Sequence, residues 1–123
     1  MGSEALTDLQ LAVMKALWRI GAGGVSEVLA ALAEDGKELA PTTVATLLQR
    51  LAKQGWVKHK KNGRQFTYQA KIEREEAAKG VLDRVLNAFF GGNVSALAAQ
   101  LLESEQLTAD DLKELRQLLK SKA

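Results

Sequence analysis

The dipeptide Asn62-Gly63 stands between two runs of strand-forming residues, and this arrangement constrains the fold more than any other feature of the chain. Asn-Gly is the strongest short signal for a type I′ hairpin turn, because both residues tolerate positive φ. The runs on either side cover residues 56–60 and 65–69, and Lys61 and Arg64 lie between them. We therefore expect a two-stranded ribbon with a basic tip.

Three helical segments precede this ribbon. The capping-box sequence Thr7–Gln10 predicts a first helix that ends near residue 20, before a run of glycines. Ser26 is the expected N-cap of a short second helix. Pro41 suits the first position of a third helix, which should end before Gly55. Three helices followed by a basic hairpin is the order of a winged helix-turn-helix, whose third helix enters the major groove of DNA.

Charge along the chain is strongly segregated. Residues 39–72 hold seven basic residues and no acidic one, whereas residues 1–38 sum to −3 and residues 73–123 to −2, which gives the net +2. Such a block is the expected footprint of a phosphate backbone, and it coincides with the third helix and the hairpin. The residues that we expect at the DNA from their charge and their place on these elements are Thr42, Thr43, Thr46, Gln49, Arg50, Lys53, Lys58, Lys60, Lys61 and Arg64.

The last part of the chain, residues 73–123, predicts three helices, at about 73–90, 94–102 and from the capping residue Thr108 onward. Their apolar residues cover more surface than so short a segment can bury alone. We therefore expect them to form a core shared by two copies of the chain, although a bundle folded back onto residues 1–72 is the alternative. The expected dimerisation residues are Val81, Leu82, Val85, Leu86, Phe89, Phe90, Leu97, Leu101, Leu112, Leu115 and Leu119.

The predicted fold class is therefore mainly α with a small β-hairpin wing. A winged helix-turn-helix N-terminal domain should cover residues 1–72, and a C-terminal helical dimerisation domain should cover residues 73–123. No apolar run approaches the ~18 residues that cross a bilayer, so we expect no membrane insertion and a cytoplasmic location.

The chain has few residues that could support catalysis. Zero cysteines exclude disulfides and thiolate metal sites, and the single histidine, His59, is better explained as a surface residue of the wing than as a metal ligand or a pH switch. Helix capping and solvation explain the carboxylates near the C-terminus, which are Glu103, Glu105, Asp110, Asp111 and Glu114. We expect no enzyme, no catalytic residue, no bound metal and no cofactor.

The sequence resembles the penicillinase-repressor (BlaI/MecI/CopY) family of winged-helix transcriptional regulators over nearly its whole length. Gln10 stands where a Glu is usual in this family. The residues that carry the resemblance are Leu6-Thr7, Val13-Met14, Leu17-Trp18, Thr43-Val44, Thr46-Leu47, Arg50-Leu51, Gly55, Val57, Gly63-Arg64, Phe66, Tyr68 and Gly91-Gly92.

The resemblance implies a DNA-binding transcriptional repressor: a homodimer that binds an inverted-repeat operator on double-stranded DNA and blocks transcription. The DNA contacts that it implies are Thr42, Thr43, Thr46, Arg50 and a wing aromatic, Tyr68. It also implies a membrane sensor-protease that triggers cleavage of the tail near Gln100-Leu101, although relatives have Asn-Phe there. Copper-sensing relatives use a cysteine motif, which this chain lacks, so copper sensing through thiolates is excluded.

One alternative function remains open at the level of the sequence. A winged-helix module can bind a protein instead of DNA, and the basic wing would then meet an acidic partner. Competition with duplex DNA is the test, since a protein partner that uses another surface would stay bound, whereas one that shares the wing would be displaced.

Overall fold

The computed structural model describes residues 6–122 and divides the chain into two compact units, Met1–Val81 and Leu82–Ala123. The units meet inside α4, whereas the division expected from the sequence follows residue 72. The elements in chain order are α1 (Asp8–Ile20), β1 (Ala22–Gly23), α2 (Val25–Glu34), α3 (Pro41–Lys53), β2 (Val57–Asn62), β3 (Gln65–Ala70), α4 (Arg74–Phe90), α5 (Val94–Leu102) and α6 (Ala109–Lys122).

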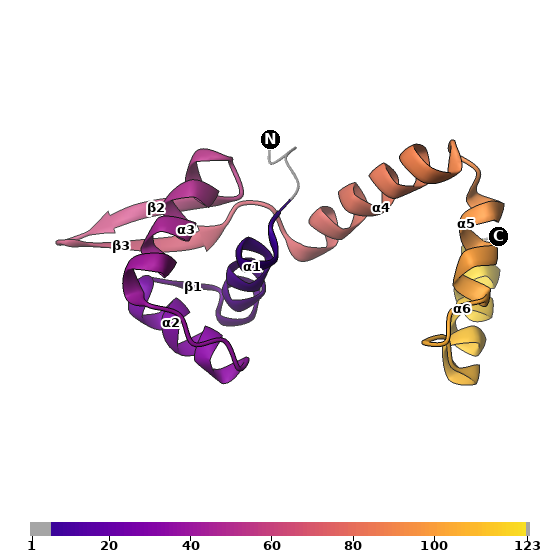
Figure 1. Cartoon of the computed structure of the whole chain (residues 1–123), viewed down its shortest axis with the longest axis horizontal. Helices are drawn as coiled ribbons and strands as arrows, with labels where there is room; N and C mark the ends of the chain where they lie inside the picture. Colours follow the sequence, from indigo (N-terminus) through magenta and orange to yellow (C-terminus); the bar gives the residue numbers. More distant parts are fainter. Residues whose placement is uncertain (1–5, 123) are drawn as a thin grey trace. The chain divides into compact units, whose positions relative to one another are not determined.

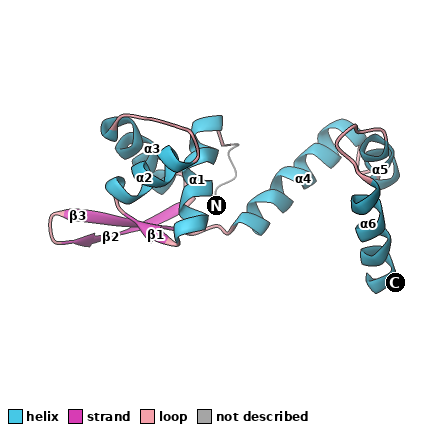
Figure 2. Ribbon diagram, turned by 90° about the horizontal axis from the view of Figure 1, so that it is seen from below, coloured by secondary structure: helices cyan, strands magenta, loops and turns pink. Residues whose placement is uncertain are grey.

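The first unit combines three helices with a small antiparallel sheet, as the fold-class prediction required. The sheet has three strands in the order β1-β3-β2, not the two expected. The additional strand, β1, pairs Ala22 with Gln69 and Gly23 with Tyr68. Its two residues are too few to show an alternating pattern, so the sequence predicted only a break there. The β2–β3 hairpin extends beyond the three helices and forms the wing (Figures 1 and 2).

The wing turn differs from the predicted type I′ turn. Asn62 pairs with Gln65, so the two residues of the loop are Gly63 and Arg64. Gly63 has a φ of +68°, whereas no residue other than glycine has a positive φ in the described chain. Type I′ needs positive φ at both loop residues, and glycine first with negative φ second is the pattern of type II′. The type I′ assignment was therefore wrong, although the hairpin was predicted correctly.

The core of the first unit lies between the three helices and the inner face of the sheet. Leu9 on α1 is 40% exposed, and Leu47 on α3 is only half-buried. The indole N–H of Trp18 donates a hydrogen bond to the carbonyl of Ile72 at 3.0 Å, which ties α1 to the segment after the wing. The largest fully buried side chains are Met14, Leu17, Leu32, Leu48, Leu51, Val13, Val28 and Val44.

Capping residues set where the helices of the first unit begin. Thr7 Oγ1 accepts from the backbone N–H of Gln10, and Gln10 Oε1 accepts from the N–H of Thr7, which confirms the predicted capping box. The second helix begins two residues earlier than expected. Gly24, not Ser26, is its N-cap, and the N–H of Gly24 donates to Glu27 Oε1 at 2.7 Å.

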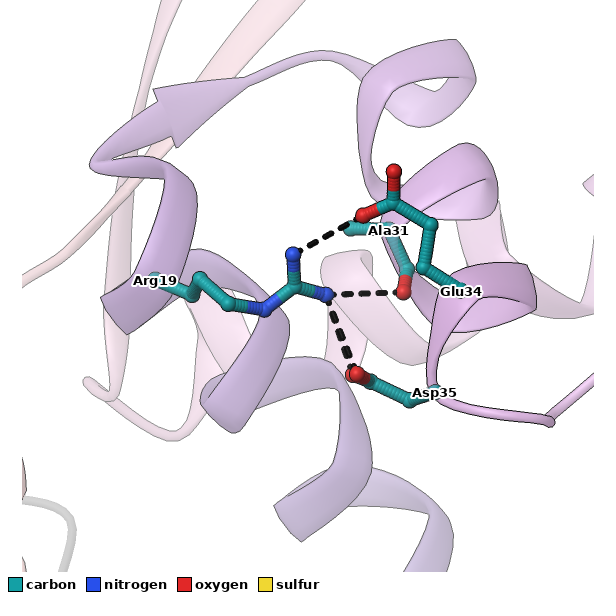
Figure 3. Close-up of polar contacts among 4 residues, drawn as sticks. All are labelled: Arg19, Ala31, Glu34 and Asp35. Carbon is teal, nitrogen blue, oxygen red and sulfur yellow. Dashed lines mark hydrogen bonds and ion pairs between the residues drawn. The ribbon is translucent and has the colours of Figure 1, made fainter.

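Arg19 joins the end of α1 to the end of α2 (Figure 3). Its Nη1 lies 2.9 Å from Glu34 Oε1, and its Nη2 lies 3.1 Å from Asp35 Oδ1 and 2.9 Å from the carbonyl of Ala31. The hydrogen bonds to Glu34 and Asp35 raise the pKa of Arg19 further above its usual value. The two carboxylates are thus neutralised locally, at the C-terminal end of α2.

The second unit has the expected helices, and none of its residues from Leu82 to Ser121 is buried. The predicted helix at residues 94–102 matches α5, and Thr108 caps α6 by accepting from the N–H of Asp111 at 3.0 Å. No residue of α4 or α5 is buried. Within the described residues, no single helix is long and apolar enough to cross a membrane; α4 and α5 pass that test only as a pair, with a 99° bend between them.

Candidate nucleic-acid interface

The exposed face of α3 carries hydroxyl, amide and basic side chains. Five of the six candidates on this helix are exposed, and Thr43 is half-buried. Val44, Leu48 and Leu51 on the opposite face are fully buried, so packing fixes which side of α3 faces outward. The exposed candidates are Thr42, Thr46, Gln49, Arg50 and Lys53.

One threonine of this face is already engaged within its own helix. Thr46 Oγ1 donates to the carbonyl of Thr42 at 3.0 Å. Its hydroxyl oxygen can still accept a hydrogen bond, and its methyl group can contact an apolar group such as the thymine methyl. Thr46 therefore offers an acceptor and a methyl to a partner, whereas Gln49 and Arg50 offer donors.

The basic residues of the block are unneutralised. In the part of the chain that the structure describes, every ion pair involves Arg19, so none of the seven cations of residues 39–72 has a carboxylate partner. Arg50 and Lys53 lie in the last turn of α3, where the helix dipole also favours cations. The helix dipole accounts for the positions of two of the seven cations. The other five lie outside the helix, on the wing and just after it.

The cations of the wing lie on two faces of the sheet. Val57, Tyr68 and Ala70 are buried, which defines the inner face. Because side chains alternate along a strand, Lys61 lies on this inner face, whereas Lys58 and Lys60 lie on the outer face. The outer pair lines a separate hollow together with Asn62, Thr67 and Gln69. The structure therefore does not gather all the predicted wing cations on one surface.

The aromatic residue expected at the DNA, Tyr68, is only 5% exposed. Burial raises the pKa of its phenol above the usual value. The ring belongs to a cluster with His59 and Phe66, in which the His59 and Phe66 rings meet edge-on with centroids 5.2 Å apart. Phe66, at 42% exposed, is presented to solvent by the wing, and His59 is exposed as well. The alternating pattern places both rings on one face but does not show where the helices cover that face.

A hollow of about 300 Å³ lies where α2, α3 and the wing meet. Gln49 from α3 and Arg64 from the wing turn, both expected at the DNA, line it together. Glu27, Gln65 and Phe66 also line it and were not expected as site residues. Their signal in the sequence was weak, because none belongs to the exposed face of the third helix or to the basic residues. In residues 6–122, no group of three or more histidine, cysteine or acidic residues could hold a metal ion.

Three helices, a short three-stranded sheet and an exposed third helix beside a protruding wing define a winged-helix protein. Comparison with known families gives the particular group. The model of the penicillinase repressor family matches residues 6–121, and the chain belongs to this family. The family is one of repressors, not of enzymes.

Two curated relatives are similar over almost the whole chain. The penicillinase repressor of Bacillus licheniformis is 32% identical over 114 residues, which cover 93% of this chain and 88% of the relative. The methicillin resistance regulatory protein MecI of Staphylococcus aureus (strain N315) is 25% identical over 117 residues, which cover 95% of this chain and 94% of the relative.

One similar solved structure is that of a relative bound to DNA. The Bacillus licheniformis repressor BlaI, in its monomeric form in complex with the blaP half-operator, matches 59% of this chain and 88% of its own with a TM-score of 0.50. It is 33% identical to this chain over that part. The family and the winged-helix fold predicted from the sequence are thus confirmed.

Proposed function

We propose that this chain is a cytoplasmic transcriptional repressor that binds an inverted-repeat operator on double-stranded DNA as a homodimer. Occupation of the promoter would block transcription, so the mechanism needs no bond making. The observation that carries the proposal is the joint exposure of the α3 face and the wing turn, at which Gln49 and Arg64 line one hollow amid unpaired positive charge. Membership of the penicillinase repressor family supports it.

Each group of candidate contacts has a physical role in this proposal. Arg50, Gln49 and the threonines of α3 would reach base edges and nearby phosphates in the major groove. Lys61 and Arg64 would hold the flanking backbone from the wing, and Lys53 would add a phosphate contact at the end of α3. We leave Tyr68 out of the direct contacts, since its burial supports a packing role, and we place Phe66 beside the DNA instead.

Dimerisation through the second unit is part of the same proposal. Large apolar side chains of α4, α5 and α6 are exposed in the single chain, including Phe89 at 81% and Leu119 at 72%. Exposed apolar surface on this scale is typical of an interaction site. The relative solved in monomeric form occupies a half-operator, and two joined chains would occupy two such halves in inverted orientation.

Release from the operator would follow cleavage near Gln100-Leu101, triggered by a membrane sensor-protease. Both residues are exposed, but they lie in the helix α5, which must open locally before a protease can bind it as an extended chain. Cutting between them would remove α6 from the chain. A chain truncated after Gln100 should therefore bind operator DNA as a monomer and with lower affinity, and an unchanged dimer after truncation would contradict this route.

The salt dependence of DNA binding tests the proposed contacts between basic residues and phosphates. If each chain meets about four phosphates, a dimer neutralises about eight, and log K should fall against log salt with a slope near about −7. A slope shallower than about −2 on the best operator would contradict the proposal. Selection of bound duplexes from a random pool tests operator recognition and dimerisation. A dimer should select a palindromic consensus, whereas a protein-interaction module should select none.

A further inference from the structure

Glu27 is the acidic residue of the hollow between α2, α3 and the wing. It lies in the first turn of α2 and lines the hollow together with Gln49 and Arg64. All other lining residues are neutral or basic. A carboxylate among the groups proposed to face a polyanion is unfavourable unless it has a function there.

The backbone holds this carboxylate firmly in place. Glu27 Oε1 accepts a charge-assisted hydrogen bond from the N–H of Gly24 at 2.7 Å. Two glycines allow the close approach: a Cβ on Gly23 would lie 2.8 Å from Glu27 Cβ, and one on Gly24 would lie 3.0 Å from the carbonyl oxygen of Phe66. The first turn of α2 is thus pressed against β3, which fixes the position of Glu27 relative to the wing.

The second carboxylate oxygen of Glu27 is left for a partner. In residues 6–122 the hydrogen bond of Glu27 is the one to Gly24, and Arg19 is the cation of every ion pair. The helix dipole favours an acidic residue in a first turn, but a neutral glutamine could accept the same hydrogen bond from Gly24. The cap and the dipole account for a carboxylate at this position, but they use one of its oxygens and leave the other beside the hollow that Gln49 and Arg64 share.

We propose that Glu27 is a specificity-determining residue, whose free carboxylate oxygen accepts a hydrogen bond from the exocyclic amino group of a base in the major groove. This inference rests on the proposed operator-binding function. The major-groove amino donors are N4 of cytosine and N6 of adenine, and a carboxylate is a suitable acceptor for them. Glu27 reads this donor next to Gln49.

The same charge lowers affinity for all other DNA. At a site without the amino donor, the carboxylate is desolvated without a partner and lies near phosphates that repel it. Glu27 therefore weakens non-specific binding while its hydrogen bond supports operator binding. Both effects raise the ratio of operator affinity to non-specific affinity, which is the quantity that matters on a genome.

Glu27→Gln tests the inference with little disturbance of the fold. The glutamine oxygen can keep the hydrogen bond from Gly24, while an amide NH₂ replaces the free oxygen and cannot accept from a base amino group. Glu34→Gln is the matched control, because it removes the same charge from the other end of α2, outside the hollow. Thermal melting of both variants shows whether each remains folded.

The readouts are affinity for operator and scrambled duplexes and base preference in a random-pool selection. For Glu27→Gln we expect scrambled DNA to bind about threefold tighter at low salt, with the gain disappearing in high salt. We also expect a preference for cytosine or adenine at one position of each half-site to fall by about fivefold. Glu34→Gln should retain the wild-type preference at every position.

Two results overturn the inference, and they are distinct from failure of the proposed function. If Glu27→Gln keeps every base preference of the wild type, or shifts operator and scrambled affinities by the same factor, Glu27 does not determine specificity. In either case the wild type still selects a palindrome, and the repressor proposal stands. If the wild-type protein selects no duplex at all, the proposed function fails first.

Discussion

The phenol of Tyr68 links packing to pH at the level of a single residue. Its pKa lies above the usual value because burial penalises the phenolate. A raised pKa in the folded state means that the stability contribution is present below about pH 10 and is lost as pH rises toward the folded value. The free energy of unfolding of Tyr68→Phe should therefore fall less steeply with rising pH than that of the wild type. Urea unfolding from pH 8 to 11 measures this, and parallel curves for the two proteins would contradict it.

Arg50 is the single residue at which base and phosphate contacts can be separated. Arg50→Ala should lose about 1 to 3 kcal/mol of operator affinity if the guanidinium touches a base edge, with less loss on scrambled DNA. A phosphate contact would instead weaken both duplexes alike. Fluorescence anisotropy on the two duplexes distinguishes these outcomes. Arg74→Ala, at the start of α4 and outside the predicted contacts, is the matched control and should change neither affinity.

At the level of elements, the wing should act through its tip and inner face. Replacing Lys61 and Arg64 by alanine removes two phosphate contacts per chain and four per dimer, so the slope of log K against log salt should become shallower by about 3.6. The control replaces Lys15 and Lys37, two exposed cations outside the basic block, and removes the same charge. Equal slopes for the two double variants would show that the wing tip does not touch the DNA.

Elements with a local signal could be predicted from the sequence. The capping box at Thr7, the proline at the start of α3 and the glycine of the wing turn each act within a few residues, and the structure has a boundary at each of them. β1 was missed because its pairing with β3 joins residues 45 and 47 positions apart in sequence, and two residues show no periodicity. Long-range pairing of this kind leaves no local pattern.

The candidate site was predictable where it depends on charge and helix faces, and not where it depends on packing between elements. The exposed polar residues of α3 follow from its apolar period, and all five of them were expected. The burial of Tyr68 and the place of Glu27 in the hollow depend on how α2 and α3 lie against β3. Only the fold shows that Tyr68 is buried and that Glu27 lines the hollow.

For the whole molecule, the two units differ in how they satisfy their apolar surface. The first unit buries a core of its own around Leu17 and Leu48, so it has what an independently folded domain needs. In the second unit large apolar residues stay exposed, including Leu82, Phe89 and Leu102. Removing such surface from water contributes about 25 cal/mol per Å², which favours association with another copy. DNA binding and dimerisation are thus proposed to lie in different units.

A charge placed on the apolar helices should separate these two activities. Phe89→Glu combined with Leu119→Glu would put two carboxylates per chain into the proposed shared core, where desolvation opposes them. We expect this double variant to sediment as a monomer at concentrations where the wild type is a dimer. Its affinity for an isolated half-site should match that of the wild type, because the first unit is untouched, while affinity for the full inverted repeat should fall at least about tenfold.

The control for this variant adds the same charge to the same helices at polar positions. Asn87 and Gln117 are both exposed, on α4 and α6, and their replacement by glutamate leaves the apolar residues in place. This control should remain a dimer and keep its affinity for the full operator. If the Phe89 and Leu119 variant also stays dimeric in sedimentation equilibrium, the apolar helices do not join the subunits. Dimerisation would then have to use the first unit, and the assignment of separate units to DNA and to the partner chain would be wrong.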